Sequence, residues 1–112
     1  MGLRDRLPGR RGRPGTVRSA ESSDLAHLRD WASSRAGVEG FVEPQTHTTT
    51  TTLVLVASSG EWTRRRVDSG KVAFAFGQKL GIPVYDVSAV GYPPRMREWT
   101  AKRKAIEDGA GG

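Results

Sequence analysis

The chain contains no cysteine among its 112 residues and only two histidines, His27 and His47. The absence of cysteine excludes disulfides, thiol catalysis and cysteine-ligated zinc. Two histidines are too few for a histidine metal site unless carboxylates complete the ligand set. The sequence therefore predicts a protein without a metal or other cofactor.

Long apolar runs are also missing from the chain. The longest, residues 53–57, is far shorter than the ~20 residues of a membrane-spanning helix. The charged residues at the N-terminus are not followed by an apolar segment, which argues against a signal peptide. We therefore expect a cytoplasmic protein that does not contact membranes.

The net charge of +6 is distributed unevenly along the chain. Residues 1–18 carry +5, residues 19–94 carry −1 and residues 95–112 carry +2. A nearly neutral centre argues against a surface built entirely for nucleic acid, and favours a neutral domain with basic arms.

The N-terminal segment, residues 1–20, is rich in arginine, glycine and proline and has almost nothing to bury. Such a composition predicts a segment that is disordered when free. Its arginines, including Arg10, Arg11 and Arg13, could bind phosphates bidentately, or the segment could simply act as a solubilising tail. A single α+β domain is expected over residues 21–106, followed by a loose glycine-rich tail over residues 107–112.

Apolar periodicity and capping residues predict three helices. The first covers about 24–36, begins at Ser22 or Ser23 and ends near Gly37. The second follows a cap at Asp68 or Ser69 and ends at Gly81. Its apolar face consists of Val72, Ala73, Phe76 and Leu80, and Phe74 points elsewhere. The third covers 95–109, with Met96, Trp99 and Ile106 on one side.

Four strands are predicted between these helices, over residues 38–44, 46–57, 61–67 and 82–87. The threonine run 48–52 is explained by β-propensity, and residues 53–57 are apolar at both parities, which is typical of a central strand. Residues 58–60 form a hairpin turn. The resulting fold class is α+β in the order α-β-β-β-α-β-α. We expect a mixed four-stranded sheet with two helices packed on it, and a C-terminal helix.

The most unusual stretch is the arginine triplet of Arg64, Arg65 and Arg66 within "EWTRRRV". Strand alternation places Trp62, Arg64 and Arg66 on one face and Arg65 on the other. The triplet could protect an edge strand from aggregation. It could equally form a phosphate-binding ridge, with Trp62 stacking on a base.

A second candidate surface is "VGYPPRMREW", residues 90–99. Tyr92, Arg95, Arg97 and Trp99 combine aromatic rings with guanidinium groups, which is common in binding patches. The alternative is an amphipathic helix that docks Trp99 on the sheet.

The expected order of elements is similar to two nucleic-acid-binding architectures. The α-β-β-β-α part resembles a double-stranded-RNA-binding domain, although the second helix starts with a single lysine, Lys71. The longer order resembles the core of restriction-endonuclease-like nucleases. Those nucleases need an acid on one strand and an acid–x–lysine on the next to hold Mg²⁺ and activate water, but residues 53–57 contain no acid and Glu61-Trp62-Thr63 has no lysine.

At sequence level, "EWTRRRV…AFAFGQKLGIPVYDVSAVGYPPRMREW" resembles a family of small actinobacterial proteins of unknown role, over roughly residues 24–104. Family members are sometimes labelled oxidoreductases. This chain lacks a Gly-x-Gly-x-x-Gly motif and a cysteine pair. A lysine at position 96 would suggest a hydride-transfer site, but this position is methionine.

These patterns predict a small non-catalytic binding protein that contacts RNA or DNA. The alternative is a protein-interaction adaptor with no nucleic-acid role, and the third possibility is an enzyme whose site is not visible in the sequence. The predicted binding residues combine the arginine triplet, its flanking residues, the 90–99 segment and the N-terminal arm: Trp62, Arg64, Arg65, Arg66, Lys71, Tyr92, Arg95, Arg97, Trp99, Arg10, Arg11 and Arg13.

Overall fold

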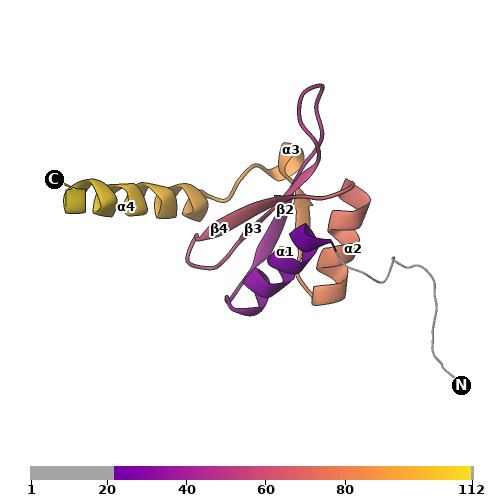
Figure 1. The fold of residues 1–112 in the computed structure, drawn as a ribbon, viewed down its shortest axis with the longest axis horizontal. Coiled ribbons are helices and arrows are strands. Elements are labelled where there is room, and N and C mark those ends of the chain that lie inside the picture. The colour runs from indigo at the N-terminus through magenta and orange to yellow at the C-terminus, as the bar shows by residue number, and fades with distance from the viewer. Residues whose placement is uncertain (1–21, 112) are drawn as a thin grey trace, which may run out of the picture.

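The structure, a computed structural model, describes residues 22–111 and has a four-stranded sheet at its centre (Figure 1). The strands are β2 (Glu39–Glu43), β3 (Thr52–Val56), β4 (Trp62–Arg66) and β5 (Val84–Asp86). The helices are α1 (Ser23–Ser33), α2 (Gly70–Leu80), α3 (Val87–Val90) and α4 (Pro94–Gly111). This architecture confirms the predicted α+β class. The N-terminal arm, with Arg10, Arg11 and Arg13, lies outside the described residues.

The sheet is mixed, in the order β4-β3-β2-β5. Strands β2, β3 and β4 form an antiparallel meander, and β5 pairs in parallel with β2. Because β2 and β4 are both antiparallel to β3, the last strand is also parallel to β4, as the sequence predicts. The crossover through α2 leaves β4 and β5 as the two edges of the sheet.

Helices α1 and α2 lie side by side on one face of the sheet (Figure 1). They bury a core that includes Leu28, Trp31 and Phe76 against the sheet. Phe76 is 8% exposed and Phe74 is 44% exposed, which confirms the prediction that Phe76 faces the core and Phe74 does not. Leu80, at the end of the same helix, is 37% exposed and does not belong to this core, contrary to prediction.

The opposite face is covered by less of the chain. Phe41, Val54, Val56 and Met96 form a second buried cluster there, and Trp62 and Val87 pack against it. The four residues 53–56 of β3 are all 0% exposed, because this strand contributes to the cores on both faces. The prediction of a central strand is therefore confirmed.

Helix α4 begins against the β3–β4 hairpin and then leaves the domain. Gly60 in the hairpin has φ +97°, and a Cβ at this position would lie 2.2 Å from the Arg95 carbonyl oxygen. Only glycine therefore allows this close approach. Residues 101–109 are exposed, and the helix projects beyond the sheet (Figure 1). Ile106 is 57% exposed, so it does not share the buried environment of Met96.

Local hydrogen bonds shorten two of the predicted elements by several residues. Helix α1 ends at Ser33, where the backbone N–H of Ser34 caps the last carbonyls, so the predicted end near Gly37 is wrong. Strand β3 begins only at Thr52, because the Thr46 hydroxyl accepts the N–H groups of Thr48 and Thr49 in a turn. Such local bonds compete with the sheet, so β-propensity does not explain residues 48–51.

The caps around α2 and β5 follow local chemistry. Ser69 accepts the Val72 N–H at the start of α2, and Gly81 ends the helix in the left-handed conformation at φ 72°, as predicted. Asp86 accepts the Ser88 N–H and thereby starts the four-residue helix α3. The sequence did not predict this helix, and it ends β5 one residue before the expected boundary.

Candidate functional site

The arginine triplet is divided between the two faces of β4. On the face covered by α1, Thr63 Oγ1 lies 3.0 Å from His27 Nε2, and Arg65 forms an ion pair with Asp24 at 3.5 Å. On the other face, Trp62 packs against the cluster that contains Met96. The predicted alternation is therefore correct, and Arg65 cannot contact the same ligand surface as Trp62.

Arg64 has a carboxylate partner across the sheet. Its guanidinium donates to both oxygens of Glu43, with Nε–Oε1 at 2.7 Å and Nη2–Oε2 at 3.0 Å. The guanidinium carbon also lies 5.2 Å from the ring centroid of Trp62. This bidentate ion pair and stacking contact occupy the groups that the sequence assigned to phosphate and base binding.

Glu43 is the centre of a hydrogen-bond network under the sheet. Besides Arg64, the carboxylate accepts the hydroxyl groups of Thr52 and Tyr92. Burial opposes ionisation of this carboxylate, but the bonds from Arg64, Thr52 and Tyr92 outweigh burial and lower the pKa of Glu43. The hydrogen bond to Glu43 raises the pKa of Tyr92, so the phenol remains the donor. The network thereby ties the residues that precede α4 to β2 and β4.

A groove of about 380 Å³ lies beside this network, between Trp62 and α4. We call it the α4 groove, and its lining residues are Trp62, Tyr92, Pro93, Met96, Arg97, Thr100, Ala101 and Lys104. The walls are almost entirely apolar, and Arg97 and Lys104 are exposed. The groove therefore combines an apolar interior with a cationic border.

The aromatic wall of the α4 groove is fixed by hydrogen bonds. The indole N–H of Trp62 donates to the Thr100 hydroxyl at 2.9 Å, and that hydroxyl donates to the Met96 carbonyl at 3.1 Å. Tyr92 is held by Glu43 on the other side. Because both rings are already positioned, a ligand does not have to order them on binding.

Two predicted binding residues on α4 have roles in packing instead. Arg95 donates to the Ala57 carbonyl and to Glu39, both at 2.8 Å, so its guanidinium joins α4 to the sheet. Trp99 is half-buried beside Gly60, and the guanidinium of Arg103 lies 5.7 Å from its ring. The alternative in which Trp99 docks this helix on the domain describes the structure better than a binding patch does.

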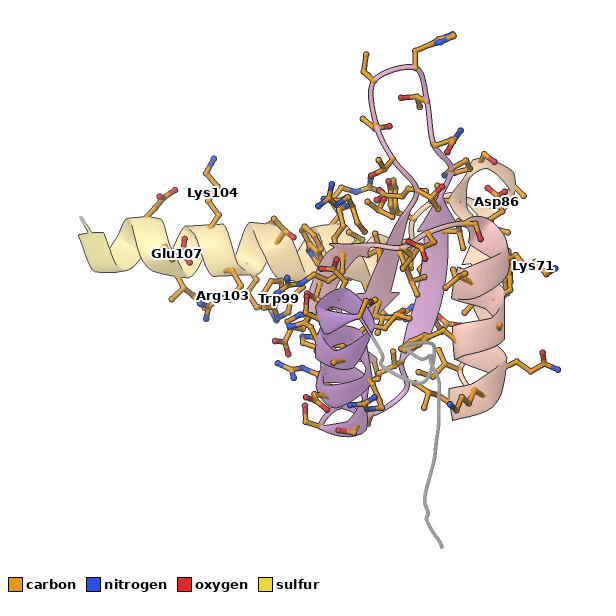
Figure 2. All side chains as sticks on the ribbon, turned by 45° about the vertical axis from the view of Figure 1, so that its right-hand side comes forward. Lys71, Asp86, Trp99, Arg103, Lys104 and Glu107 are labelled. Carbon is orange, nitrogen blue, oxygen red and sulfur yellow. The ribbon has the colours of Figure 1, made fainter. Side chains whose placement is uncertain are left out.

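The remaining predicted residues lie apart from the α4 groove. Lys71 is on α2, on the opposite side of the molecule from Lys104 and Glu107 of α4 (Figure 2). Arg66 is exposed at the end of β4 and has no ion pair with the described residues. The structure thus brings Trp62, Tyr92 and Arg97 together and separates them from Lys71.

Sequence reasoning missed five of the eight residues that line the groove, and the carboxylate behind it. Pro93, Met96, Thr100 and Lys104 recur at spacings of three or four residues, which place them along one face of a helix. That spacing was a usable signal. No comparable signal joins Glu43 to Tyr92, because they lie 49 residues apart in the chain.

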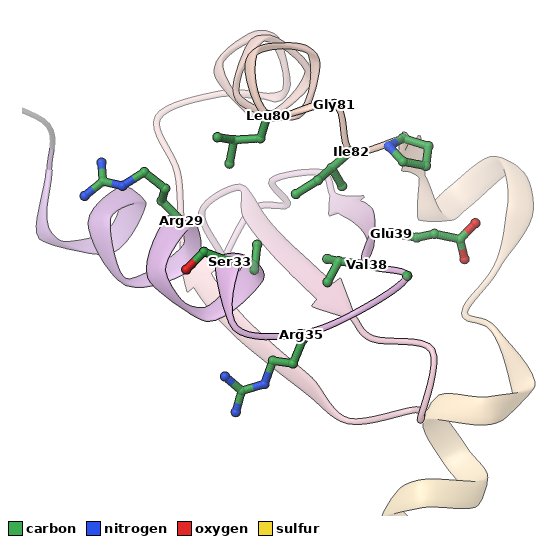
Figure 3. Close-up of a pocket in the computed structure, with 11 residues that line it drawn as sticks. Arg29, Ser33, Arg35, Val38, Glu39, Leu80, Gly81 and Ile82 are labelled. Atoms are coloured by element: carbon green, nitrogen blue, oxygen red, sulfur yellow. The ribbon is translucent and has the colours of Figure 1, made fainter.

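A second cavity, of about 630 Å³, lies between the C-terminal ends of α1 and α2. Leu80, Ile82 and Val38 line it, while the charged ends of Arg29 and Glu39 turn away from its middle (Figure 3). Arg35 forms an ion pair with Glu61 at 2.8 Å and stacks on Trp31. The cavity therefore has no converging set of polar groups.

Within residues 22–111 there is no group of three or more histidine, aspartate or glutamate side chains that could hold a metal ion. None of the helices in this range is long and apolar enough to cross a membrane. The chain matches no known family profile, no curated protein and no solved structure. The geometry of the α4 groove is therefore the basis for a functional proposal.

Proposed function

We propose that this protein is a non-catalytic protein-binding module and that its α4 groove receives an apolar side chain of a protein partner. The observation that carries this proposal is the apolar groove with prepositioned rings at Trp62 and Tyr92. Buried apolar anchors that fill preformed pockets provide most of the affinity in protein interfaces. Arg64 and Arg65 already form ion pairs, so fewer cations are available to bind phosphates. This favours a protein over a nucleic acid as the partner.

The projecting helix supports the same function. Residues 101–109 of α4 are exposed, although isolated helices of about this length are marginal in water. A partner that contacts the α4 groove also contacts this part of the helix, at Ala101 and Lys104. Binding would thereby stabilise the helix and bury apolar surface that is exposed in the free protein.

The test is an affinity capture with a variant that blocks the groove. Ala101→Glu places a charge at an exposed position of the groove lining. Ala75→Glu makes the same change at an exposed position of α2 and serves as the matched control. We expect proteins that bind the wild type and Ala75→Glu to be depleted at least ~10-fold by Ala101→Glu, because the larger side chain projects at the groove and its carboxylate must lose water when a partner packs there.

A partner found in this way is then purified and titrated against the three proteins by calorimetry. Loss of binding only in Ala101→Glu supports the proposal. Equal affinity of the purified partner for Ala101→Glu and Ala75→Glu would contradict it.

A second candidate, binding of RNA or DNA, is favoured by the exposed cations that remain. Arg66, Arg97, Lys102 and Lys104 have no ion pair with the described residues, and six further arginines lie within residues 1–18. Phosphate contacts by such residues would give affinity that falls steeply with salt.

The arginine triplet provides the test of this candidate. Arg64 and Arg66 share a face and Arg65 does not, so replacement of all three by glutamine should reduce the log–log salt slope by about one or two units, not three. Fluorescence anisotropy with a labelled RNA and a labelled DNA oligonucleotide across a salt series measures the slope. An unchanged slope and affinity would remove β4 from any nucleic-acid site.

A further inference from the structure

The outer edge of β4 has unpaired backbone groups. The Val67 N–H donates to Thr51 at 3.1 Å, and the Glu61 carbonyl accepts the Ala57 N–H at 2.8 Å, so the odd-numbered residues bond with β3. In an antiparallel pair the alternate residues direct their N–H and C=O groups to the other side. Those residues are Trp62, Arg64 and Arg66, and within residues 22–111 no strand lies on the outer side of β4 to bond with their outward groups.

The side chains of the same three residues lie on the face that contains the α4 groove. Trp62 lines the groove itself, and Arg64 stacks on Trp62. Arg66 follows on the same face and is exposed. The open backbone edge and the apolar groove are therefore adjacent parts of one surface, which we call the β4 edge surface.

The charge of the β4 edge surface determines which chain can pair with it. A second copy of β4 would bring arginines opposite arginines, and like charges directly opposite each other destabilise a sheet. An acidic residue opposite Arg66 would instead form a cross-strand ion pair, whereas Arg64 is already paired with Glu43. Arg66 has no carboxylate partner among the described residues, so it gains one from such a residue.

Resting on the protein-binding function above, we propose that β4 accepts an extended acidic segment of a protein partner as a fifth strand. Successive side chains of a strand alternate between its faces. The partner residue opposite Trp62 is apolar and packs at the α4 groove. The residue opposite Arg66, four positions away, is aspartate or glutamate. Main-chain hydrogen bonds supply affinity and the alternate side chains supply specificity.

Selection of binders from a random dodecapeptide display library tests this inference directly on the protein. The full-length chain is the target, and Ala101→Glu is the counter-target, so that groove-dependent peptides are retained. We expect the retained peptides to share one large apolar residue with an acidic residue four positions from it. Groove-dependent peptides without this acid would overturn the fifth-strand inference and leave the proposed function intact.

Substitutions at Arg66 separate its charge from its backbone. Arg66→Gln removes only the charge and should weaken a selected peptide by about threefold. Arg66→Pro also removes the outward N–H without removing a bond to β3, and should weaken binding by at least ~10-fold. Lys79→Gln, an exposed change at the end of α2, is the control and should leave the affinity unchanged. Equal affinities of Arg66→Pro and Arg66→Gln would overturn strand addition.

Peptides with N-methylated amides test the same pairing on the unmodified protein. Methylation of the peptide amides whose N–H groups face β4 should abolish binding. Methylation of the intervening amides, whose N–H groups face away from β4, should preserve it. Equal effects of the two sets would overturn the fifth strand, whether or not Arg66→Pro folds. A selection that yields no peptide dependent on Ala101, together with oligonucleotide binding that depends on Arg66, would overturn both proposals in favour of nucleic acid.

Discussion

The two faces of the sheet are covered in different ways. One face carries α1 and α2, whose apolar residues, such as Leu28 and Phe76, form a continuous core with the strands. The other face carries a smaller cluster around Met96, a carboxylate network centred on Glu43 and the open α4 groove. Most of the polar contacts that join distant parts of the chain lie on this second face or at its border.

Because of this difference, the first face contributes mainly to stability and the second face is the one available for binding. A face covered by two helices buries apolar side chains and gains stability roughly in proportion to the area removed from water. The second face retains an accessible apolar groove because α4 contacts the sheet only through its first turns. Substitutions on the first face should therefore affect folding, and exposed substitutions on the second face should affect binding.

The largest expected effect is on the helix-covered face. Phe76→Ala should lower the free energy of unfolding by ~3–5 kcal/mol, because Phe76 is 8% exposed within the core. Phe74→Ala on the same helix should cost less than ~1 kcal/mol, because Phe74 is 44% exposed. Urea denaturation measures both values. Equal losses would show that α2 is buried on two sides and would remove the contrast between the faces.

A smaller effect is expected where α4 joins the second face. Arg95→Ala leaves Glu39 and the Ala57 carbonyl without their donor and should cost ~1–3 kcal/mol. Arg97→Ala, two positions along the same helix, should change stability by less than ~0.5 kcal/mol because Arg97 is exposed. The comparison uses chemical denaturation at one pH. An Arg95→Ala variant with unchanged stability would mean that α4 is not held by this residue.

The carboxylate network predicts a pH-dependent contribution to stability. The folded protein lowers the pKa of Glu43, so its contribution is present above the unfolded pKa of ~4.3 and is lost as the pH falls through the folded value. Glu43→Gln should therefore cost ~1 kcal/mol at pH 7, and this cost should shrink below about pH 4.

Denaturation curves between pH 7 and pH 3 measure this effect. Glu98→Gln removes an exposed carboxylate of α4 and serves as the control, which should retain the wild-type pH dependence. A difference between wild type and Glu43→Gln that is constant across this range would show that the network does not depend on the ionised carboxylate.

The smallest effect is expected at the N-terminus. Removal of residues 1–18, which lie outside the described residues, should shift the melting temperature by less than about 2 °C, because the segment offers little apolar surface to either face. Differential scanning calorimetry of the two chains makes the comparison. A fall of about 5 °C or more would show that the segment packs on the domain.

The sequence by itself determined most of the local architecture. Periodicity and caps located α2 between Ser69 and Gly81, and the apolar run of β3 identified the central strand. Strand alternation also separated Arg65 from Trp62 and Arg64 correctly. These features depend on residues close together in the chain, so local physical chemistry is enough to predict them.

Only the tertiary structure decided which charged residues are available. Arg64 and Arg95 resemble Arg66 and Arg97 in sequence, but Glu43 and Glu39 bind the first two. Those carboxylates lie 21 and 56 residues away along the chain, and the register of the sheet and the packing of α4 against it bring them within hydrogen-bond distance. The α4 groove arises in the same way, because Trp62 meets Thr100 only when α4 packs under the hairpin. Long-range packing therefore gives the three arginines of the triplet different environments. One arginine on each face of β4 has a carboxylate partner, and Arg66 lies at an open strand edge.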